Sequence, residues 1–200
     1  TPGLNEHAFT MKSLSDARRL RAHVIERLEH ADITRLPEVK KGALTFTVIG
    51  GGFSGIETVG EIKELIDRSL CYYPNIESSE IRVVVLEFSD RVLNEMPKSL
   101  AAYAQKNLIE RGIEIQLGVG VAKCTGTQLV TTTDEIIDTR TIVATIGNAP
   151  SLAVSKMPLP FQHGRIRVER NFRVKGYQNI WSIGDCATVS YTHLRAHETR

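Results

Sequence analysis

The sequence predicts an α/β fold: a Rossmann-like parallel sheet with helices on both faces and a small antiparallel β-meander, plus flanking fragments of a second domain. Three observations predict this fold. Apolar runs typical of buried strands alternate with segments of helical period. A GxGxxG pattern joins a strand to a long helix, and a short Thr- and Val-rich stretch later replaces a crossover helix.

The chain begins with a segment that has the pattern of an amphipathic helix. Ser13 with Asp16 three residues later resembles a capping box, and apolar residues then recur at steps of three and four. We therefore predict a helix over residues 14–30. Residues 37–42 are polar and rich in breakers, so we expect a connector there. LTFTVIG, from Leu44, is dense in β-branched residues and predicts a strand that is buried on both faces.

The next segments repeat the alternation of helix and strand. Residues 56–66 carry the helical period until CYYPNIESS interrupts it, and residues 81–86 are an apolar strand. Pro97 suits the first turn of a following helix, and Gly112 suits its left-handed C-terminal residue. Residues 113–117, IEIQL, alternate as a strand does. Right-handed crossovers turn this order into a parallel sheet.

The pattern changes after the third strand. Residues 119–138 contain short Thr- and Val-rich runs separated by turn signals, which predicts the antiparallel meander. Residues 141–147, TIVATIG, predict a fourth parallel strand. A Pro-punctuated connector follows, then a short strand at GRIRVE and another at NIWSIGDCA, which would end in Gly184 and Asp185.

Composition excludes several classes of function. The 200 residues carry a formal charge of +2 with scattered Lys and Arg, so we expect no nucleic-acid partner. Cys71, Cys124 and Cys186 form no CxxC pair, so we expect no disulfide framework and no metal site, and we interpret them as small buried residues in a reducing compartment. Residues 190–200 resemble a translated sequencing adapter, and we assign them no fold or function.

The glycines of VIGGGFSGIE have distinct predicted roles. Gly50 takes a turn that a side chain would obstruct, Gly52 lets the backbone approach a diphosphate, and Gly55 lets helix and strand pack closely. Unpaired amides and the helix dipole would bind the diphosphate. The alternative is a glycine-rich turn without a ligand. The predicted dinucleotide-contacting residues of this loop are Gly50, Gly51, Gly52, Phe53, Ser54 and Gly55.

Two carboxylates complete the predicted site. Glu87 ends the second strand, where it would accept hydrogen bonds from both ribose hydroxyls and repel a 2′-phosphate, which favours NADH over NADPH. It lies 32 residues after Gly55, where about twenty is usual, and it could instead be a solvated strand-end charge. We place Glu57 in the first turn of the helix, where it either serves the helix dipole or, as a catalytic residue, orients the nicotinamide carboxamide or relays a proton.

Taken together, these segments resemble the pyridine-nucleotide disulfide oxidoreductase superfamily and, within it, the type II NADH dehydrogenases. The motifs are SLSDARRLRAHVIERLEHAD, LTFTVIGGGFSGIETVGEI, VVVLEFSDRVL, ATIGNAP and GRIRVERNFRVKGYQNIWSIGDCA, in that order. The resemblance implies an NADH domain inserted between two halves of an FAD domain. Residues 43–151 would form the NAD(H)-binding domain, residues 1–42 and 152–189 would belong to the FAD-domain segments, and residues 190–200 would be a non-native tail.

The resemblance also implies roles for individual residues. Thr145 and Gly147 would lie where the backbone approaches the dinucleotide, and Glu57 would lie between nicotinamide and flavin. Gly184 and Asp185 would contact FAD, although an aspartate there could merely cap a turn. The implied cofactors are FAD and NAD(H), and the implied electron acceptor is a quinone. A homodimer, and a cytoplasmic enzyme peripheral on the inner face of the cell membrane through a C-terminal segment absent here, would fit the family.

The resemblance leaves several alternatives open. The family's first GxGxxG would precede Thr1, so we expect a truncated fragment that is inactive by itself. A sulfide:quinone, rubredoxin or nitrite reductase could carry the same NADH domain. An S-adenosylmethionine-dependent methyltransferase and a non-catalytic dinucleotide-binding module are further alternatives.

Overall fold

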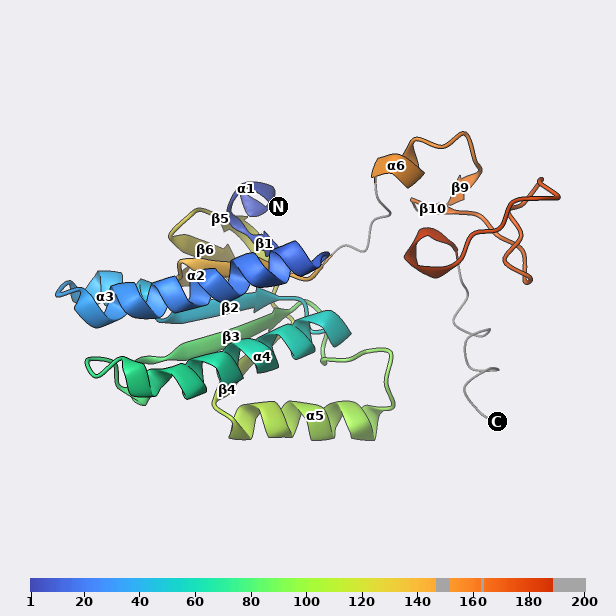
Figure 1. Ribbon diagram of the computed structural model, residues 1–200. Coiled ribbons are helices and arrows are strands. Elements are labelled where there is room, and N and C mark those ends of the chain that lie inside the picture. The colour runs from blue at the N-terminus through green and yellow to red at the C-terminus, as the bar shows by residue number, and fades with distance from the viewer. Residues whose placement is uncertain (147–151, 163, 189–200) are drawn as a thin grey trace. The chain divides into compact units, whose positions relative to one another are not determined.

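The computed structural model describes residues 1–146, 152–162 and 164–188 (Figure 1). The chain divides into two compact units, Thr1–Ile146 and the segment from Gly147 onward. The sequence-predicted sheet, meander and glycine pattern all fall in the first unit.

A five-stranded parallel sheet forms the centre of the first unit. Its middle strand is buried at every position, as its β-branched and aromatic residues predict. Ile49 lies beside both Leu86 and Ala144, so the carboxyl ends of three strands meet at one edge. The four predicted strands are confirmed, and a two-residue edge strand is added at the amino-terminal segment. In spatial order the strands are β1 (Phe9–Thr10), β8 (Thr141–Ala144), β2 (Thr45–Ile49), β3 (Arg82–Glu87) and β4 (Ile113–Leu117).

Long helices cover one face of this sheet. In Figure 1, α2 (Leu14–Ile33) and α4 (Phe53–Ser69) run across the sheet, and α5 (Lys98–Glu110) follows beyond β4. The predicted capping box is present, because Ser13 and Asp16 exchange side-chain and backbone hydrogen bonds at the start of α2. The apolar stripes of the helices bury one core against the sheet: Leu20, Val24, Leu28, Val59, Ile62, Ile66 and Leu108 pack with Phe46, Val48, Val83, Val85 and Val143.

The predicted antiparallel meander covers the other face. Its strands β5 (Val121–Cys124), β6 (Gln128–Thr131) and β7 (Ile136–Asp138) pair in chain order. A second core joins the meander residues Cys124, Leu129 and Ile137 to Ile49, Val84, Leu86 and Ile142 of the sheet. The sequence also predicts helices on this face. In the described part of the chain this face carries the short helix α1 (Leu4–His7), whose Leu4 packs against the same core.

Two local expectations differ from the structure. The expected connector at residues 37–42 is a helix, α3 (Pro37–Ala43). Pro37 is preorganised for the first helical position, Glu38 lies in the first turn and Lys40 in the last, so local signals favour the helix despite its polar composition. Pro97 is the N-cap of α5 and lies just outside its first turn. Two short 3₁₀ turns, η1 (Leu70–Tyr72) and η2 (Ser78–Glu80), occupy the CYYPNIESS region.

The second unit contains only short elements in its described part. A helix, α6 (Leu152–Ser155), precedes an antiparallel pair, β9 (Phe161–Gln162) and β10 (Arg165–Ile166), which confirms a strand at GRIRVE. The strand expected at NIWSIGDCA is wrong. Trp181 makes one isolated bridge to Arg173, and the segment then turns as η3 (Gly184–Cys186), because Gly184 adopts a φ of 74° that ends the extended backbone.

The cysteines differ from one another in burial. Cys124 is buried as expected, whereas Cys71 is exposed and Cys186 is half-buried, so the expectation of burial is wrong for Cys71. Across the described ranges, His, Cys, Asp and Glu form no cluster of three or more that could hold a metal ion. No helix within those ranges is long and apolar enough to cross a membrane.

Candidate functional site

The turn after β2 has the geometry that the sequence predicts for its first glycine. Gly50 has a φ of 105°, in the region that favours glycine. A Cβ at this position would lie 2.9 Å from Thr145 Oγ1 and 2.9 Å from Ile146 Cγ2. Both the backbone angle and the lack of space therefore require glycine. We call residues 50–55 the glycine loop.

The other two glycines of the pattern have opposite surroundings. A Cβ on Gly55 would lie 1.8 Å from the Gly50 carbonyl oxygen, so the first turn of α4 packs directly on the preceding turn. A Cβ on Gly52 would meet nothing within 4 Å. Gly52 therefore faces open space, where a ligand could approach the backbone closely. This arrangement fits a diphosphate, and dinucleotide binding remains a prediction.

The amino end of α4 opens onto the same space. Among the described residues no side chain caps this end, and Ile56 N–H donates to Gly52 C=O at 3.0 Å. The amides of the first turn before Ile56 are those that a helix leaves without intrahelical partners. Phe53 and Ser54 are exposed beside them. Free amides and the positive end of the helix dipole together favour an anionic group here.

Glu87 faces the glycine loop from the end of β3. Its carboxylate is half-buried and accepts hydrogen bonds from the Gly51 N–H and, at 2.7 Å, from the Ser89 N–H. The alternative of a purely solvated strand-end charge does not describe this contact. A carboxylate has lone pairs beyond these two bonds, so ribose hydroxyls could still bind to Glu87, as the sequence predicts.

Thr145 holds the glycine loop from the neighbouring strand β8. Its hydroxyl donates to Ile49 C=O at 2.9 Å and lies 3.3 Å from Gly50 C=O, and its N–H donates to Ile49 C=O at 3.0 Å. The side chain of Thr145 therefore supports the turn, a role that the sequence analysis did not assign. Gly147, the other residue predicted here, lies outside the described residues.

Glu57 lies one turn further along α4 than we expected. The helix begins at Phe53, so Glu57 is its fifth residue, and the first turn contains no acidic residue. The expected first-turn position is wrong. Because the helix dipole acts mainly within the first turn, it is a weak explanation for the placement of Glu57. The Glu57 side chain is exposed and forms none of the hydrogen bonds or ion pairs found between described residues.

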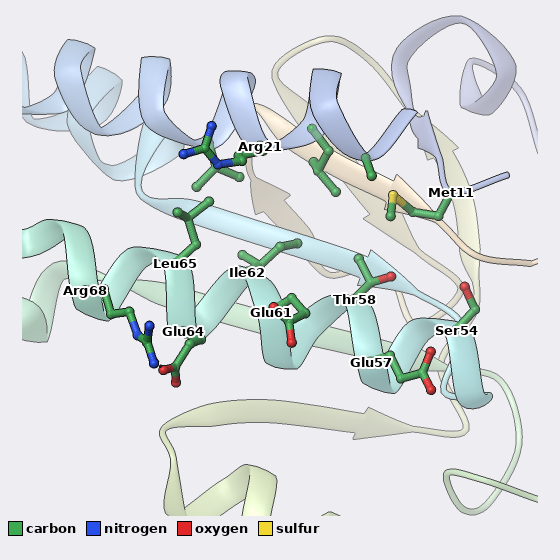
Figure 2. A pocket seen from close by; sticks show the side chains of 13 residues that line it. Met11, Arg21, Ser54, Glu57, Thr58, Glu61, Ile62, Glu64, Leu65 and Arg68 are labelled. Atoms are coloured by element: carbon green, nitrogen blue, oxygen red, sulfur yellow. Dashed lines mark hydrogen bonds and ion pairs between the residues drawn. The ribbon is translucent and has the colours of Figure 1, made fainter. Parts of the chain in front are cut away.

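Glu57 and Ser54 line one end of a groove between α2 and α4, which we call the α2–α4 groove (Figure 2). Its volume is about 630 Å³, and Met11 lines it from the segment before α2. Figure 2 shows Ser54 and Glu57 at the amino end of α4, and Glu64 with its partner Arg68 at the far end. The floor is apolar: Leu20, Val24, Ile62 and Leu65. A flat, partly apolar group could therefore lie in this groove, next to the glycine loop and beside the carboxylate of Glu57.

The family model described as pyridine nucleotide-disulphide oxidoreductase matches residues 1–199. The chain belongs to this family. The match confirms the superfamily to which the sequence motifs point.

Several relatives narrow the resemblance. The chain is 32% identical over 194 residues to the "Type II NADH:quinone oxidoreductase Ndh" of Mycobacterium tuberculosis, covering 92% of this chain and 42% of that protein. It is 29% identical over 191 residues to a "Probable NADH dehydrogenase" of Dictyostelium discoideum, covering 94% and 42%. The chain thus spans about two fifths of the length of these curated relatives.

Solved structures of other oxidoreductases share the fold. The structure of NDH2 from Plasmodium falciparum in complex with NADH matches with a TM-score of 0.83 at 22% identity, covering 93% of this chain and 40% of that one. An NAD-dependent persulfide reductase from A. fulgidus matches with a TM-score of 0.66 at 23% identity, covering 93% and 30%. Proteins named for different oxidoreductase activities therefore share this fold.

The second unit of this family member contains the residues predicted to contact FAD. Gly184 is exposed, and a Cβ there would meet nothing within 4 Å. The backbone of Asp185 forms part of η3, whereas its side chain lies outside what the structure describes. The contact of both residues with FAD remains a prediction.

Sequence reasoning missed a set of residues that support the glycine loop. Ser89, Val92 and Leu93 follow Glu87 and contact the loop or its carboxylate partner. No glycine, proline or periodic pattern marks them, because Ser89 and Leu93 contribute backbone N–H groups and Val92 contributes a packing contact. The match between EFSDRVL and the family motif is the only sequence signal that touches them.

Proposed function

We propose that this chain is the NADH-binding part of a flavin-dependent NADH:quinone oxidoreductase. The observation that supports this most is the opening at Gly52, which lies between unpaired amides of α4 and the carboxylate of Glu87. The similarity to proteins named type II NADH:quinone oxidoreductase and NADH dehydrogenase supports the same function. The chain spans about two fifths of these relatives, so the proposed activity is that of a longer protein that contains this chain.

The residues of the first unit have separate proposed roles in holding NADH. Backbone amides of Gly52, Phe53 and Ser54 would bind the diphosphate, and Glu87 would accept the ribose hydroxyls. FAD, when bound, would supply the flavin that accepts a hydride from NADH. Glu57, at one end of the α2–α4 groove, would orient the nicotinamide carboxamide or relay a proton to the electron acceptor.

The second unit would supply a contact to FAD. Gly184 presents bare backbone without a side chain nearby, which suits close approach of a cofactor. Asp185 is the residue that we expect to hydrogen-bond the flavin nucleotide. In this proposal residues 43–151 form the NAD(H)-binding domain, and residues 1–42 and 152–189 belong to the FAD-binding part.

The remaining features of the proposed enzyme follow from its relatives. A quinone would be the electron acceptor, as the name of the Mycobacterium tuberculosis relative states for that protein. Peripheral attachment to the inner face of the cell membrane and a homodimer are further parts of the proposal. A sulfide, rubredoxin or nitrite acceptor remains the alternative within the family.

Gly52→Val tests the proposed site directly. The backbone at Gly52 has a φ of −74° and a ψ of −175°, which valine can adopt, and its Cβ would point into open space. We therefore expect an unchanged melting temperature and NADH affinity weakened by more than about tenfold, because the side chain would occupy the diphosphate space. Isothermal titration of the 200-residue chain with NADH, NADPH and S-adenosylmethionine measures this.

Gly60→Ala is the matched control. Gly60 lies in the same helix, and its Cβ would approach only Arg111 Nη1, at 3.8 Å. It should bind NADH as the wild type does. Binding of S-adenosylmethionine in preference to NADH, or equal NADH affinity in Gly52→Val and wild type, would contradict the proposed function. Tight NADH binding without quinone reduction in the longer parent would favour a non-catalytic module.

A further inference from the structure

Hydrogen bonds hold both peptide groups that flank the Cα atom of Gly51. Its N–H donates to Glu87 Oε2, and its C=O accepts a hydrogen bond of 2.8 Å from Leu93 N–H. A Cβ on Gly51 would lie 3.0 Å from Val92 Cγ1 and 3.0 Å from Glu87 Oε2. The segment after β3 therefore packs directly on the glycine loop and sets the orientation of the peptide that precedes Gly52.

Leu93 has an unusual backbone conformation at this contact. Its φ is 50°, which a leucine rarely adopts, and its side chain is 5% exposed. Val92 is 0% exposed and shares a small core with Ala101 of α5. Burial of the two side chains explains how the strained backbone persists, because leaving it would expose both of them.

Arg91 closes the turn that contains Leu93. Its guanidinium donates to Asn94 C=O, to Asn94 Oδ1 at 3.0 Å and to Met96 C=O at 3.3 Å. Met96 N–H donates to Leu93 C=O at 2.9 Å within the same turn. In the described ranges no carboxylate forms an ion pair with Arg91. The planar, five-donor group of Arg91 is thus used on the carbonyl oxygens of its own turn.

We propose that Arg91 is a positioning residue for the dinucleotide-binding loop. By closing the turn over residues 91–96, Arg91 keeps Leu93 N–H directed at Gly51 C=O, while Glu87 holds the N–H of the same glycine. The bond to the Gly51 C=O also fixes the Gly52 N–H, which belongs to the same planar peptide group and lies beside the open space in which the diphosphate would lie. This role rests on the proposed function of the glycine loop as an NADH site.

Arg91→Ala in the 200-residue chain tests the proposal. We expect NADH affinity, measured by titration calorimetry, to fall about tenfold, because the loop must be ordered anew on binding. NMR amide exchange should accelerate at Gly51 and Leu93 and stay unchanged in β3 and β4. Arg91→Lys keeps the charge without the fork of donors and should resemble Arg91→Ala. Asn94→Ala removes one acceptor and should shift both readouts in the same direction by less.

Arg19→Ala is the matched control, because Arg19 is an exposed arginine of the same unit that pairs with Asp16 at 3.9 Å and does not line the α2–α4 groove. It should leave NADH affinity and loop exchange unchanged. The proposal is overturned if Arg91→Ala keeps wild-type affinity and exchange, if Arg91→Lys restores both, or if exchange accelerates throughout the sheet. Failure of the wild type to bind NADH would refute the proposed function, and the exchange rates at Gly51 and Leu93 would still decide the role of Arg91.

Discussion

The two ends of the parallel sheet differ in whether their polar groups have partners within the protein. At the carboxyl end, Gly52 and the first turn of α4 present backbone amides to open space. At the amino end, Arg82 donates to both carboxylate oxygens of Glu114 at 2.9 Å and to Glu135 at 3.3 Å, and thereby joins the sheet to the meander. At the amino end the Arg82 cation already has its carboxylate partners, whereas the carboxyl end leaves donors that a ligand could use.

Hydrogen bonds at the amino end also extend to the amino-terminal segment. His23 Nε2 of α2 lies 3.1 Å from Arg140 C=O and 3.0 Å from Thr141 Oγ1, and the His23 ring contacts Phe9 with centroids 4.6 Å apart. Thr139 Oγ1 donates to Thr45 C=O at 2.7 Å. These contacts stabilise the fold, so changes here should alter stability and leave ligand affinity unchanged, and changes at the carboxyl end should do the reverse.

Glu87→Gln, at the carboxyl end, should have a larger effect than either change at the amino end. The neutral amide offers one acceptor oxygen in place of two to the Gly51 N–H, the Ser89 N–H and the ribose hydroxyls. We expect NADH affinity to fall about tenfold and the preference for NADH over NADPH to shrink, because repulsion of a 2′-phosphate is lost. Calorimetric titration with both nucleotides measures the ratio.

Glu110→Gln serves as its control, since Glu110 is an exposed residue of α5 paired with Lys106 at 3.7 Å. It should change neither affinity. If wild type binds NADPH as well as NADH, or if Glu87→Gln leaves the ratio unchanged, the assigned role of Glu87 is wrong.

Arg82→Leu should have an intermediate effect, confined to stability. It leaves the half-buried carboxylates of Glu114 and Glu135 without their cation, and we expect a loss of about 1 kcal/mol in the free energy of unfolding after allowance for solvent screening. Urea denaturation measures the loss, and NADH affinity should stay within about twofold of wild type. A large loss of affinity would show that the two ends are coupled.

The pH dependence of stability around His23 should be the smallest effect. Burial, followed by the nearby Arg27, lowers the pKa of His23 below its ordinary value of 6.5. The unfolded chain therefore binds a proton at pH values where the folded chain does not, so this contribution to stability is present above pH 6.5 and is lost as pH falls below it.

We expect the melting temperature of wild type to fall by about 1–3 °C between pH 7 and pH 5.5 relative to His23→Asn, measured by thermal denaturation. The hydrogen bond from Arg82 lowers the pKa of Glu114 from its ordinary value of 4.5, so the stability that this carboxylate contributes is present above pH 4.5 and is lost only as the pH falls below it. Equal pH profiles of wild type and His23→Asn would contradict the assigned role of His23.

Prediction from sequence succeeded where the signal is local. The period of α4 and the β-branched run of β2 predicted their elements closely, and GxGxxG predicted which glycine turns, which packs and which stays open. It failed at α3, where composition suggested a connector, and at the segment ending in Gly184, where one bridge does not sustain a strand.

The candidate site was predicted in part. The position of Glu87 at a strand end correctly predicted that it lies beside the glycine loop. Glu57 was assigned to the wrong helical turn, because the sequence pattern does not fix the residue at which α4 begins. The support from Thr145 and Leu93 could not be predicted, because it consists of hydrogen bonds to backbone atoms of a distant segment.

The sequence by itself determined the parallel sheet, the family and the glycine pattern, because hydrophobic period and the steric freedom of glycine act over a few neighbouring residues. Only the tertiary structure decided that the edge strand β1 joins the sheet, that the meander covers its second face and that Leu93 and Glu87 hold the two peptide groups on either side of Gly51. Those features depend on backbone groups far apart in the chain, which find their partners only after the sheet has aligned its strand ends.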